Sequence, residues 1–256
     1  MQNEKLGLSG RVAVVTGGSR GIGRSVVELL SGSGVDVAIN YVHDELAAEQ
    51  TVAIAKAKGV KAIAVQADVS KLVEAEQLIQ TTVESLGRVD FLICNAGIWE
   101  GAPVEEISEE LWDKSLEINL KGTWTVCRAA VPSMKRQRFG RIVIVSSTAG
   151  QRGEANVSNY AASKGGQISF TKSLSTELGK FGINVNCVAP GWVDTEMSAG
   201  PLKDETQLKS ILQGIPVGRV ATPEDIAGPI VFLCSEWARH ITGEVLNING
   251  GSVLCG

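Results

Sequence analysis

Short apolar runs rich in β-branched residues alternate along the chain with longer segments of helical period. Seven runs have the length and composition of strands: residues 11–16, 36–40, 61–68, 90–97, 141–147, 183–191 and 245–251. They are continuously apolar, which indicates burial on both faces of a parallel sheet. Strict alternation of strands and helices predicts an α/β, doubly wound (Rossmann) fold, with a seven-stranded parallel sheet and helices on both faces.

Turn and cap residues divide the helical segments. Gly59, Gly87 and Gly140 stand where helices are expected to end, and Thr222 followed by Pro223 is typical of a helix start. No linker, repeat or low-complexity run divides the chain, so a single domain over residues 1–256 is predicted. A long excursion at about residues 196–217 interrupts the strand pattern, and segments of this size at the carboxyl edge of a sheet are often lids.

Composition narrows the classes of function. The chain has 44% hydrophobic and 20% charged residues, a net charge of −4 and a pI near 5.4, which argues against general nucleic-acid binding. Its five cysteines are not spaced like metal ligands or a redox pair, and no apolar run approaches the roughly 20 residues that cross a bilayer. We therefore expect a cytoplasmic protein without metal or membrane contact.

A glycine-rich turn, VAVVTGGSRGIG, leads from the first strand into the first helix. Gly17, Gly21 and Gly23 allow backbone N–H groups and the helix N-terminus to face a phosphate. The spacing is GxxxGxG, different from the GxGxxG fingerprint, so a purely structural turn is the alternative. Its place at the end of the first strand favours a dinucleotide.

The end of the second strand bears on the choice between NAD and NADP. NAD-binding folds commonly place an acid there, whereas this chain has Asn40 followed by Tyr41. A carboxylate would repel a 2′-phosphate and asparagine would not, and Arg20 in the glycine-rich turn can reach toward that region. NADP(H) is therefore predicted; the alternative is that Arg20 is a solvated loop charge and the protein does not discriminate.

Tyr160 and Lys164 are four residues apart and would share one face of a helix. A free phenol has a pKa near 10, and a close ammonium favours the phenolate and lowers that value. Small neighbours at positions 161–163 and 165–166 would let a cofactor approach. Chance pairing is the alternative for these two residues taken alone.

An ordered set of motifs resembles the single-domain short-chain dehydrogenases/reductases over essentially the whole chain. The motifs are TGGSRGIG (16–23), DV (68–69), NAG (95–97), IN (118–119), SS (146–147), YAASK (160–164) and PGWVDT (190–195). The resemblance implies that Tyr160 is the general acid, that Lys164 lowers its pKa and holds the nicotinamide ribose, and that Ser147 polarises the substrate carbonyl. It also implies that Asn119 supports a water that feeds protons toward Lys164.

The same resemblance implies a cofactor site. Its members in this chain are Gly17, Ser19, Arg20, Gly21, Ile22, Gly23, Asn40, Tyr41, Asp68, Val69, Asn95, Ala96, Gly97, Tyr160, Lys164, Pro190, Gly191, Val193 and Thr195. Asp68 and Val69 would flank the adenine, residues 95–97 would lie under the adenosine ribose, and residues 190–195 would bracket the nicotinamide carboxamide.

The overall pattern is most similar to the 3-oxoacyl-carrier-protein reductase branch of that family, which implies NADPH-dependent reduction of a 3-oxoacyl thioester. Arg138 falls where such reductases dock an acidic carrier protein, but Phe181 stands where a second docking arginine is expected, and residues 100–110 are acidic. A solvated helix end is the alternative for the basic segment MKRQRFGR.

Other functions stay open. A broad-specificity ketone reductase or a sugar or alcohol dehydrogenase of the same family is the main alternative, and a dinucleotide sensor without turnover is disfavoured by the complete catalytic set. The C-terminal NINGG matches family members that form tetramers, which implies a homotetramer.

Overall fold

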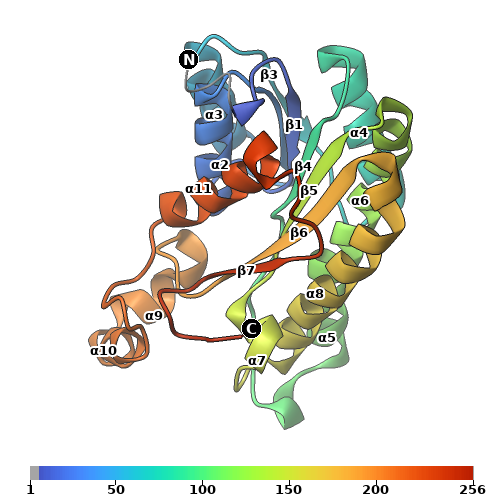
Figure 1. The fold of residues 1–256 in the computed structure, drawn as a ribbon. Helices are drawn as coiled ribbons and strands as arrows, with labels where there is room; N and C mark the ends of the chain where they lie inside the picture. Colours follow the sequence, from blue (N-terminus) through green and yellow to red (C-terminus); the bar gives the residue numbers. More distant parts are fainter. Residues whose placement is uncertain (1–5, 256) are drawn as a thin grey trace.

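The computed structural model describes residues 6–255, which fold around one parallel sheet. The strands are β1 (Val12–Val15), β2 (Asp36–Tyr41), β3 (Ala62–Gln66), β4 (Phe91–Cys94), β5 (Gly140–Val145), β6 (Ile183–Pro190) and β7 (Val245–Ile248). They lie in the order β3-β2-β1-β4-β5-β6-β7, and every neighbouring pair is parallel (Figure 1). The seven-stranded doubly wound fold predicted from the sequence is confirmed.

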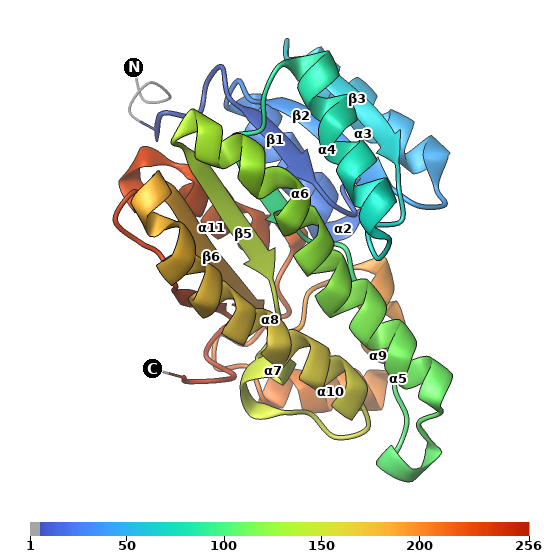
Figure 2. The same cartoon turned by 90° about the vertical axis from the view of Figure 1, so that its right-hand side faces the viewer.

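Helices cover both faces of the sheet. One face carries α2 (Gly21–Gly32), α3 (Glu45–Ala57) and α11 (Pro223–Cys234), and the other carries α4 (Leu72–Leu86), α6 (Gly122–Gln137) and α8 (Ser158–Leu178) (Figure 2). Alternate residues of β1 serve the two cores: Ala13 and Val15 pack on the side of α2, and Val14 on the other. This burial on both faces is why the strands are continuously apolar.

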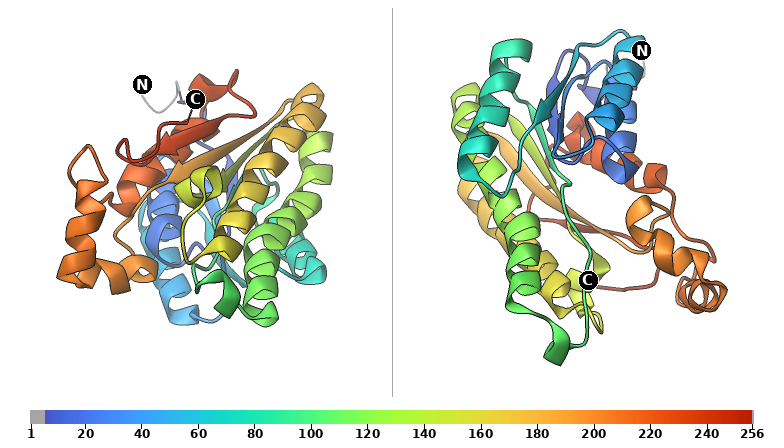
Figure 3. Two further views of the ribbon diagram at one scale, coloured as in Figure 1. Left: turned by 90° about the horizontal axis from the view of Figure 1, so that it is seen from below. Right: turned by 180° about the vertical axis from the view of Figure 1, so that it is seen from behind.

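Shorter helices connect or extend these elements. They are η1 (Val104–Glu106), α5 (Glu109–Ser115), the π-helical turn η2 (Leu116–Lys121), α7 (Thr148–Arg152), η3 (Gly179–Phe181), η4 (Glu196–Ser198), α9 (Ala199–Lys203), α10 (Glu205–Gln213) and η5 (Glu236–Ala238). The excursion predicted to be a lid contains α9 and α10, which extend to one side of the sheet (Figure 3). Neither helix has a buried residue, so little core packing holds them.

Three of the cap predictions agree with the structure and one is wrong. Thr222 caps α11 with its side chain, Gly87 ends α4 in the left-handed region, and Gly59 follows the C-cap of α3 at φ 85°. Gly140 instead begins β5, because Arg138 takes the left-handed C-cap of α6 at φ 55°. The helices of the described region include none that is both long and apolar enough to cross a bilayer.

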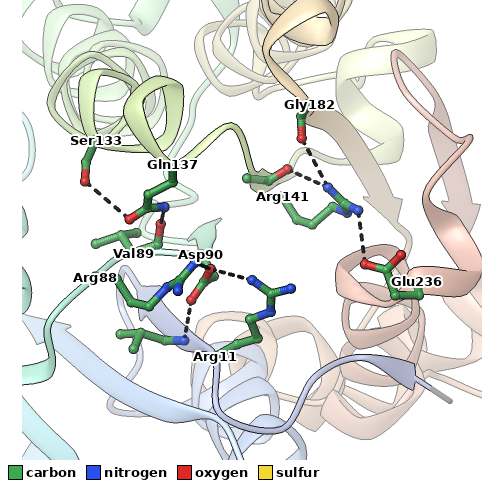
Figure 4. Close-up of polar contacts among 11 residues, drawn as sticks. Arg11, Arg88, Val89, Asp90, Ser133, Gln137, Arg141, Gly182 and Glu236 are labelled. Carbon is green, nitrogen blue, oxygen red and sulfur yellow. Dashed lines mark hydrogen bonds and ion pairs between the residues drawn. The ribbon is translucent and has the colours of Figure 1, made fainter. Parts of the chain in front are cut away.

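The amino edge of the sheet is fixed by buried charges. The Asp90 carboxylate is fully buried and accepts hydrogen bonds from Arg11 (3.1 Å), Arg88 (2.6 Å) and the backbone N–H of Val12 (3.0 Å) (Figure 4). Arg141, also buried, donates to backbone carbonyls and faces Glu236 at 3.5 Å. The Asp90 contacts tie the start of β1 to the start of β4, and those of Arg141 tie β5 to the residue before β6 and to η5, all at the edge opposite the candidate site.

The carboxyl edge contains the reversal in strand order. The chain leaves β1 for β2 on one side and, after β3, returns to β4 on the other. Ligands of open α/β sheets bind in the crevice at such a switch point. The glycine-rich turn and the NAG segment lie there, at the ends of β1 and β4.

Candidate active site

The glycine-rich turn makes a close approach that only glycine permits. Gly17 and Gly21 have φ of 60° and 53°, in the left-handed region. A Cβ on Gly23 would lie 2.2 Å from the Gly17 carbonyl oxygen, so the first turn of α2 packs directly against the loop. The chain can therefore bend from β1 into α2 within a few residues.

Asn95 holds this turn from the neighbouring strand. Its Nδ2 donates to the carbonyl oxygens of Thr16 (3.0 Å) and Gly17 (3.1 Å), and the N–H groups of Asn95 and Ala96 donate to the Thr16 hydroxyl at 2.9 and 3.0 Å. The two predicted cofactor segments are therefore one connected floor. Thr16 was not among the predicted site residues, although it opens the first motif.

The start of α2 suits a phosphate. Its N-cap residue, Arg20, makes no side-chain cap, so the first N–H groups of the helix are free to bind an anion. Ser19 is buried and its carbonyl accepts from Thr51 at 3.1 Å, while Ile22 packs against the core on the α2 side. These residues fit the pyrophosphate of a dinucleotide: an uncapped helix N-terminus follows a loop with no Cβ in the way.

Arg20 points in an unexpected direction. Its Nη1 lies 2.9 Å from a carboxylate oxygen of Glu196, and both side chains are largely exposed. Gly21 also faces this segment, because a Cβ there would lie 3.4 Å from Thr195 Cγ2. The predicted phosphate ligand is thus paired across the carboxyl edge with a residue 176 positions later.

Asn40 serves the backbone and does not point into open space. Its Nδ2 donates to the Ala67 carbonyl at 2.8 Å, and its Oδ1 accepts from Gly17 N–H at 3.4 Å. Tyr41 is buried in the core, where burial and then the charges of Glu45 and Glu49 raise its pKa. Asn40 therefore links β2, β3 and the glycine-rich turn, and its place in the cofactor site stays a prediction.

Asp68 and Val69 are similarly committed. Burial tends to raise the pKa of Asp68, but hydrogen bonds from Ser70 and the charge of Lys71 outweigh it and lower that pKa. Val69 is buried in the core, where its Cγ2 lies 3.2 Å from the position that a Cβ on Gly122 would take. Both side chains are thus occupied by contacts within the protein. Their predicted place beside the adenine stays a prediction.

Asn119 connects the cofactor floor to the helix that carries Tyr160. Its Oδ1 accepts from Ile98 N–H at 2.8 Å, and its Nδ2 donates to the Ile98 carbonyl (3.1 Å) and the Ser163 hydroxyl (3.0 Å). Gly97 lies between Asn119 and Lys164, since a Cβ there would be 3.0 Å from Asn119 Oδ1 and 3.5 Å from Lys164 Nζ. The structure thus brings residues 95–97, Asn119 and Lys164 together.

Tyr160 and Lys164 share one face of α8, as their spacing predicts. Lys164 Nζ lies 5.6 Å from the centre of the phenol ring and donates to the Val145 carbonyl at 2.8 Å. Ser147 caps α7 through a 3.1 Å bond from Ala149 N–H, and α7 packs against the start of α8. Gly150 makes this packing possible, because a Cβ there would lie 2.5 Å from the backbone carbon of Lys164.

The phenol does not have the lowered pKa expected from the sequence. Burial raises the pKa of Tyr160 to about 12; a hydrogen bond with Ser147 lowers it, and the charge of Glu154 raises it further. The sequence pattern reveals the nearby lysine but not the burial, and burial is the larger effect. In the protein without cofactor Tyr160 is therefore a protonated phenol, the form that can donate a proton.

Burial also acts on the ammonium group. It lowers the pKa of Lys164 to about 8, although Cys187 opposes the shift, so this side chain can gain or lose a proton near neutral pH. A folded-state pKa near 8 and an ordinary value of 10.5 mean that the unfolded chain binds the proton more tightly. The resulting penalty to folding is complete below pH 8 and disappears as the pH rises to 10.5.

Lys164→Met is therefore expected to increase the free energy of unfolding at pH 7 by about 1 to 3 kcal/mol, part of the gain being offset by the unpaired Val145 carbonyl. The advantage over the wild type should shrink between pH 8 and 10.5. Urea unfolding at several pH values measures both. Lys172→Met, at an exposed position of the same helix, is the matched control and should change nothing. A pH-independent difference would contradict the assignment.

The segment after β6 closes the other side of the site. Pro190 ends the strand, Gly191 N–H donates to the Ile248 carbonyl at 3.1 Å, and Val193 pairs with Ala221. Thr195 caps η4 in a reciprocal arrangement with Ser198. The backbone from 190 to 195 is thus fixed on both sides, which suits a segment predicted to bracket a flat ring.

Several residues of the site were missed by sequence reasoning. Ser146 donates to the Lys164 carbonyl at 2.8 Å, and Ser163 donates to the Tyr160 carbonyl at 2.7 Å. Asn159 donates to the Glu100 carbonyl (3.0 Å) and to Ser115 (2.7 Å), which fixes the entrance beside Tyr160. Ser146 and Ser163 lie within the SS and YAASK motifs, and Asn159 directly precedes YAASK, which is the only signal that the sequence offered.

The fold and this arrangement define a class of protein. The glycine-rich turn lies at a topological switch point, and the same edge of the sheet carries a protonated phenol, a buried ammonium and a serine hydroxyl. These groups can donate a proton and a hydrogen bond to a carbonyl oxygen but provide no redox centre. A dinucleotide would supply the hydride, so the site is that of a nicotinamide-dependent oxidoreductase.

Comparison with known proteins identifies the family. The family model described as Enoyl-(Acyl carrier protein) reductase matches residues 17–252. The 3-oxoacyl-[acyl-carrier-protein] reductase of Synechocystis sp. is 40% identical over 96% of this chain and 98% of its own length. The 3-oxoacyl-[acyl-carrier-protein] reductase FabG of Staphylococcus aureus is 41% identical over 94% of this chain and 98% of its own length.

A solved structure of another protein has the same fold. A Sinorhizobium meliloti protein assigned as a short-chain alcohol dehydrogenase superposes with a TM-score of 0.92 at 36% identity, over 95% of this chain and 96% of that one. The chain belongs to the short-chain dehydrogenase/reductase family and is an oxidoreductase of that family.

Proposed function

We propose that the protein reduces the ketone of a 3-oxoacyl thioester to a secondary alcohol with NADPH. The observation that carries the proposal is the Ser147–Tyr160–Lys164 cluster beside a dinucleotide floor, in a chain about 40% identical to two named 3-oxoacyl-carrier-protein reductases. Sequence motifs assign the same three residues.

In the proposed mechanism the nicotinamide, when bound, supplies the hydride. The Ser147 hydroxyl donates a hydrogen bond to the substrate carbonyl oxygen and holds it at the phenol. Tyr160 Oη donates the proton to that oxygen as the negative charge develops. The Lys164 ammonium stabilises the phenolate left behind, and its pKa of about 8 lets it take part in returning the proton.

The substrate would enter beside two indoles. The rings of Trp99 and Trp192 meet edge to face with centroids 5.6 Å apart, and they come from the segments that follow residues 95–97 and Gly191. Such a pair offers an apolar wall for the carbon chain next to the ketone. Leu202, Leu208, Ile211 and Leu212, partly buried on α9 and α10, would complete a lid over it.

An acidic carrier protein would find one cationic patch, which consists of Lys135, Arg138 and Lys180 around Phe181. The three charges lie 4.6, 5.8 and 5.3 Å from the centre of the Phe181 ring. Phe181, which stands where a second docking arginine is expected, therefore has three cationic side chains within cation–π distance of its ring. The patch follows the C-terminus of α8, about 30 Å along that helix from Tyr160.

Assembly as a cytoplasmic homotetramer stays a prediction.

A second candidate is a dehydrogenase of sugars or other hydroxylated substrates. Glu154 is partly buried, burial raises its pKa, and its charge acts on the Tyr160 phenol. A carboxylate near the reacting oxygen favours substrates that bring hydroxyl donors. Initial rates on a 3-oxoacyl thioester, a simple ketone and an aldose separate the candidates; the thioester should react fastest, and an aldose that outruns it would favour the second.

The cofactor preference should depend on Arg20. Arg20→Ala is expected to lower kcat/KM for NADPH about 10- to 100-fold and leave NADH unchanged, because a charge-assisted bond to the 2′-phosphate is lost. Steady-state rates with each cofactor measure this. Glu196→Gln breaks the same ion pair but keeps the guanidinium, so it should preserve or improve NADPH use. Equal losses with both cofactors would show that Arg20 does not discriminate.

A further inference from the structure

Gln167 is a fully buried amide one turn beyond Lys164, on the face of α8 that carries Tyr160 and Lys164. Its Nε2 donates to the backbone carbonyl of Asn119 at 2.8 Å and to the Thr123 hydroxyl at 2.7 Å. Gln167 therefore reaches from the catalytic helix to the main chain of a residue assigned to the catalytic set.

The π-helical turn η2 presents this carbonyl. Gly122 N–H donates to the Glu117 carbonyl five residues earlier, which is the π pattern, and π turns inside α-helices are frequent at functional sites. The Asn119 carbonyl also accepts from the Thr123 hydroxyl at 2.8 Å. Thr123 and Gln167 therefore both donate to this carbonyl from their side chains.

The other end of the amide makes a purely structural role a poor explanation. Gln167 Oε1 is buried and has no hydrogen-bond partner among the described residues. Burying an unpaired carbonyl is unfavourable, and a leucine of similar size would avoid that cost. Compared with leucine, glutamine adds only the Nε2 hydrogen bonds to the Asn119 carbonyl and the Thr123 hydroxyl.

We propose that Gln167 is a positioning residue of the catalytic site, which holds the Asn119 main chain and thereby sets the spacing between the cofactor floor and α8. Asn119 contacts both the cofactor floor and α8. Its side chain is hydrogen-bonded to the N–H and the carbonyl of Ile98, which follows residues 95–97. It also donates to Ser163, which donates in turn to the Tyr160 carbonyl. A shift of Asn119 would move the floor under the cofactor relative to the phenol.

The inference rests on the proposed ketone reduction, so its test includes a measurement that does not need turnover. Gln167→Leu removes both Nε2 contacts at nearly constant volume. We expect kcat to fall about 10- to 100-fold, since a small displacement of reacting groups is enough for that. The pH profile of kcat should shift, and the NADPH dissociation constant, from fluorescence titration, should rise several-fold. The melting temperature should change little.

Thr171→Val is the matched control. Thr171 is fully buried one turn further along α8 and donates to the Gln167 carbonyl at 2.9 Å, so its loss removes a buried hydroxyl from the same face without touching η2. It should keep the wild-type pH profile and NADPH affinity. If Gln167→Leu folds poorly, Gln167→Met keeps the length of the side chain without the donors.

The outcomes separate the two claims. A Gln167→Leu protein with wild-type kcat, pH profile and NADPH affinity overturns the positioning role, and so does a loss that Thr171→Val reproduces. A wild type that binds NADPH but reduces no ketone contradicts the proposed function instead. In that case a weakened NADPH affinity in Gln167→Leu alone still supports the effect of Gln167 on the cofactor floor.

Discussion

Tyr160→Phe is expected to lower kcat for ketone reduction by about 10² to 10⁴-fold, the usual contribution of a positioned general acid. The phenylalanine keeps the ring that packs 5.6 Å from Lys164 Nζ and removes only the hydroxyl. Because that hydroxyl is the one group that can protonate the carbonyl oxygen directly, Ser147 and Lys164 should not replace it. NADPH affinity and melting temperature should stay close to the wild type.

The variant also separates an enzyme from a sensor. Steady-state kinetics and a fluorescence titration with NADPH, on the same two protein preparations, give turnover and binding together. Loss of turnover with intact binding supports catalysis by Tyr160. Equal low activity in both proteins, with equal NADPH binding, would support a dinucleotide sensor and remove the proposed mechanism.

Gly23→Ala is expected to damage both folding and cofactor binding. The new methyl group would lie 2.2 Å from the Gly17 carbonyl oxygen and 2.7 Å from Asn95 Nδ2, so backbone as well as side chain must move. Overpacking of this kind costs about 1 to 3 kcal/mol of unfolding free energy. The displaced atoms are those that shape the phosphate-binding turn, and NADPH affinity should fall by roughly 100-fold or more if about 3 kcal/mol of anion contacts are lost.

Gly32→Ala is the control for this variant. It lies at the end of the same helix, its nearest neighbour would be Lys58 Nζ at 3.8 Å, and alanine is the better helix former. It should leave NADPH binding unchanged and stability equal or slightly higher. Urea unfolding and NADPH titration of both variants give the comparison; a Gly23→Ala protein indistinguishable from Gly32→Ala would show that the close approach is not needed.

The sheet was predictable because its signal is local. Each strand is a short apolar run, and strict alternation with helices leaves few arrangements. The C-cap of α6 was not predictable in this way, since Arg138 occupies the left-handed region where Gly140 was expected. Glycine is the usual residue at a left-handed helix C-terminus, whereas in this chain Gly140 starts β5.

The candidate catalytic residues could be proposed from an ordered set of motifs, but their environment could not be predicted. Lys164 is four residues from Tyr160 in the sequence and suggests a lowered phenol pKa, while the burial that raises it to about 12 depends on distant parts of the chain. The Arg20–Glu196 pair and the Gln167–Asn119 contact join residues 176 and 48 positions apart. Asn40 was assigned correctly to the end of β2, but the direction of its side chain is set by β3.

The most direct measurement is NADPH consumption by the purified protein with acetoacetyl-CoA as the thioester, followed by absorbance, with NADH in a parallel cuvette. We expect rapid oxidation of NADPH, much slower oxidation of NADH, and a 3-hydroxyacyl thioester as product. No turnover with either cofactor, on protein shown to bind NADPH, would contradict the assignment to 3-oxoacyl thioesters.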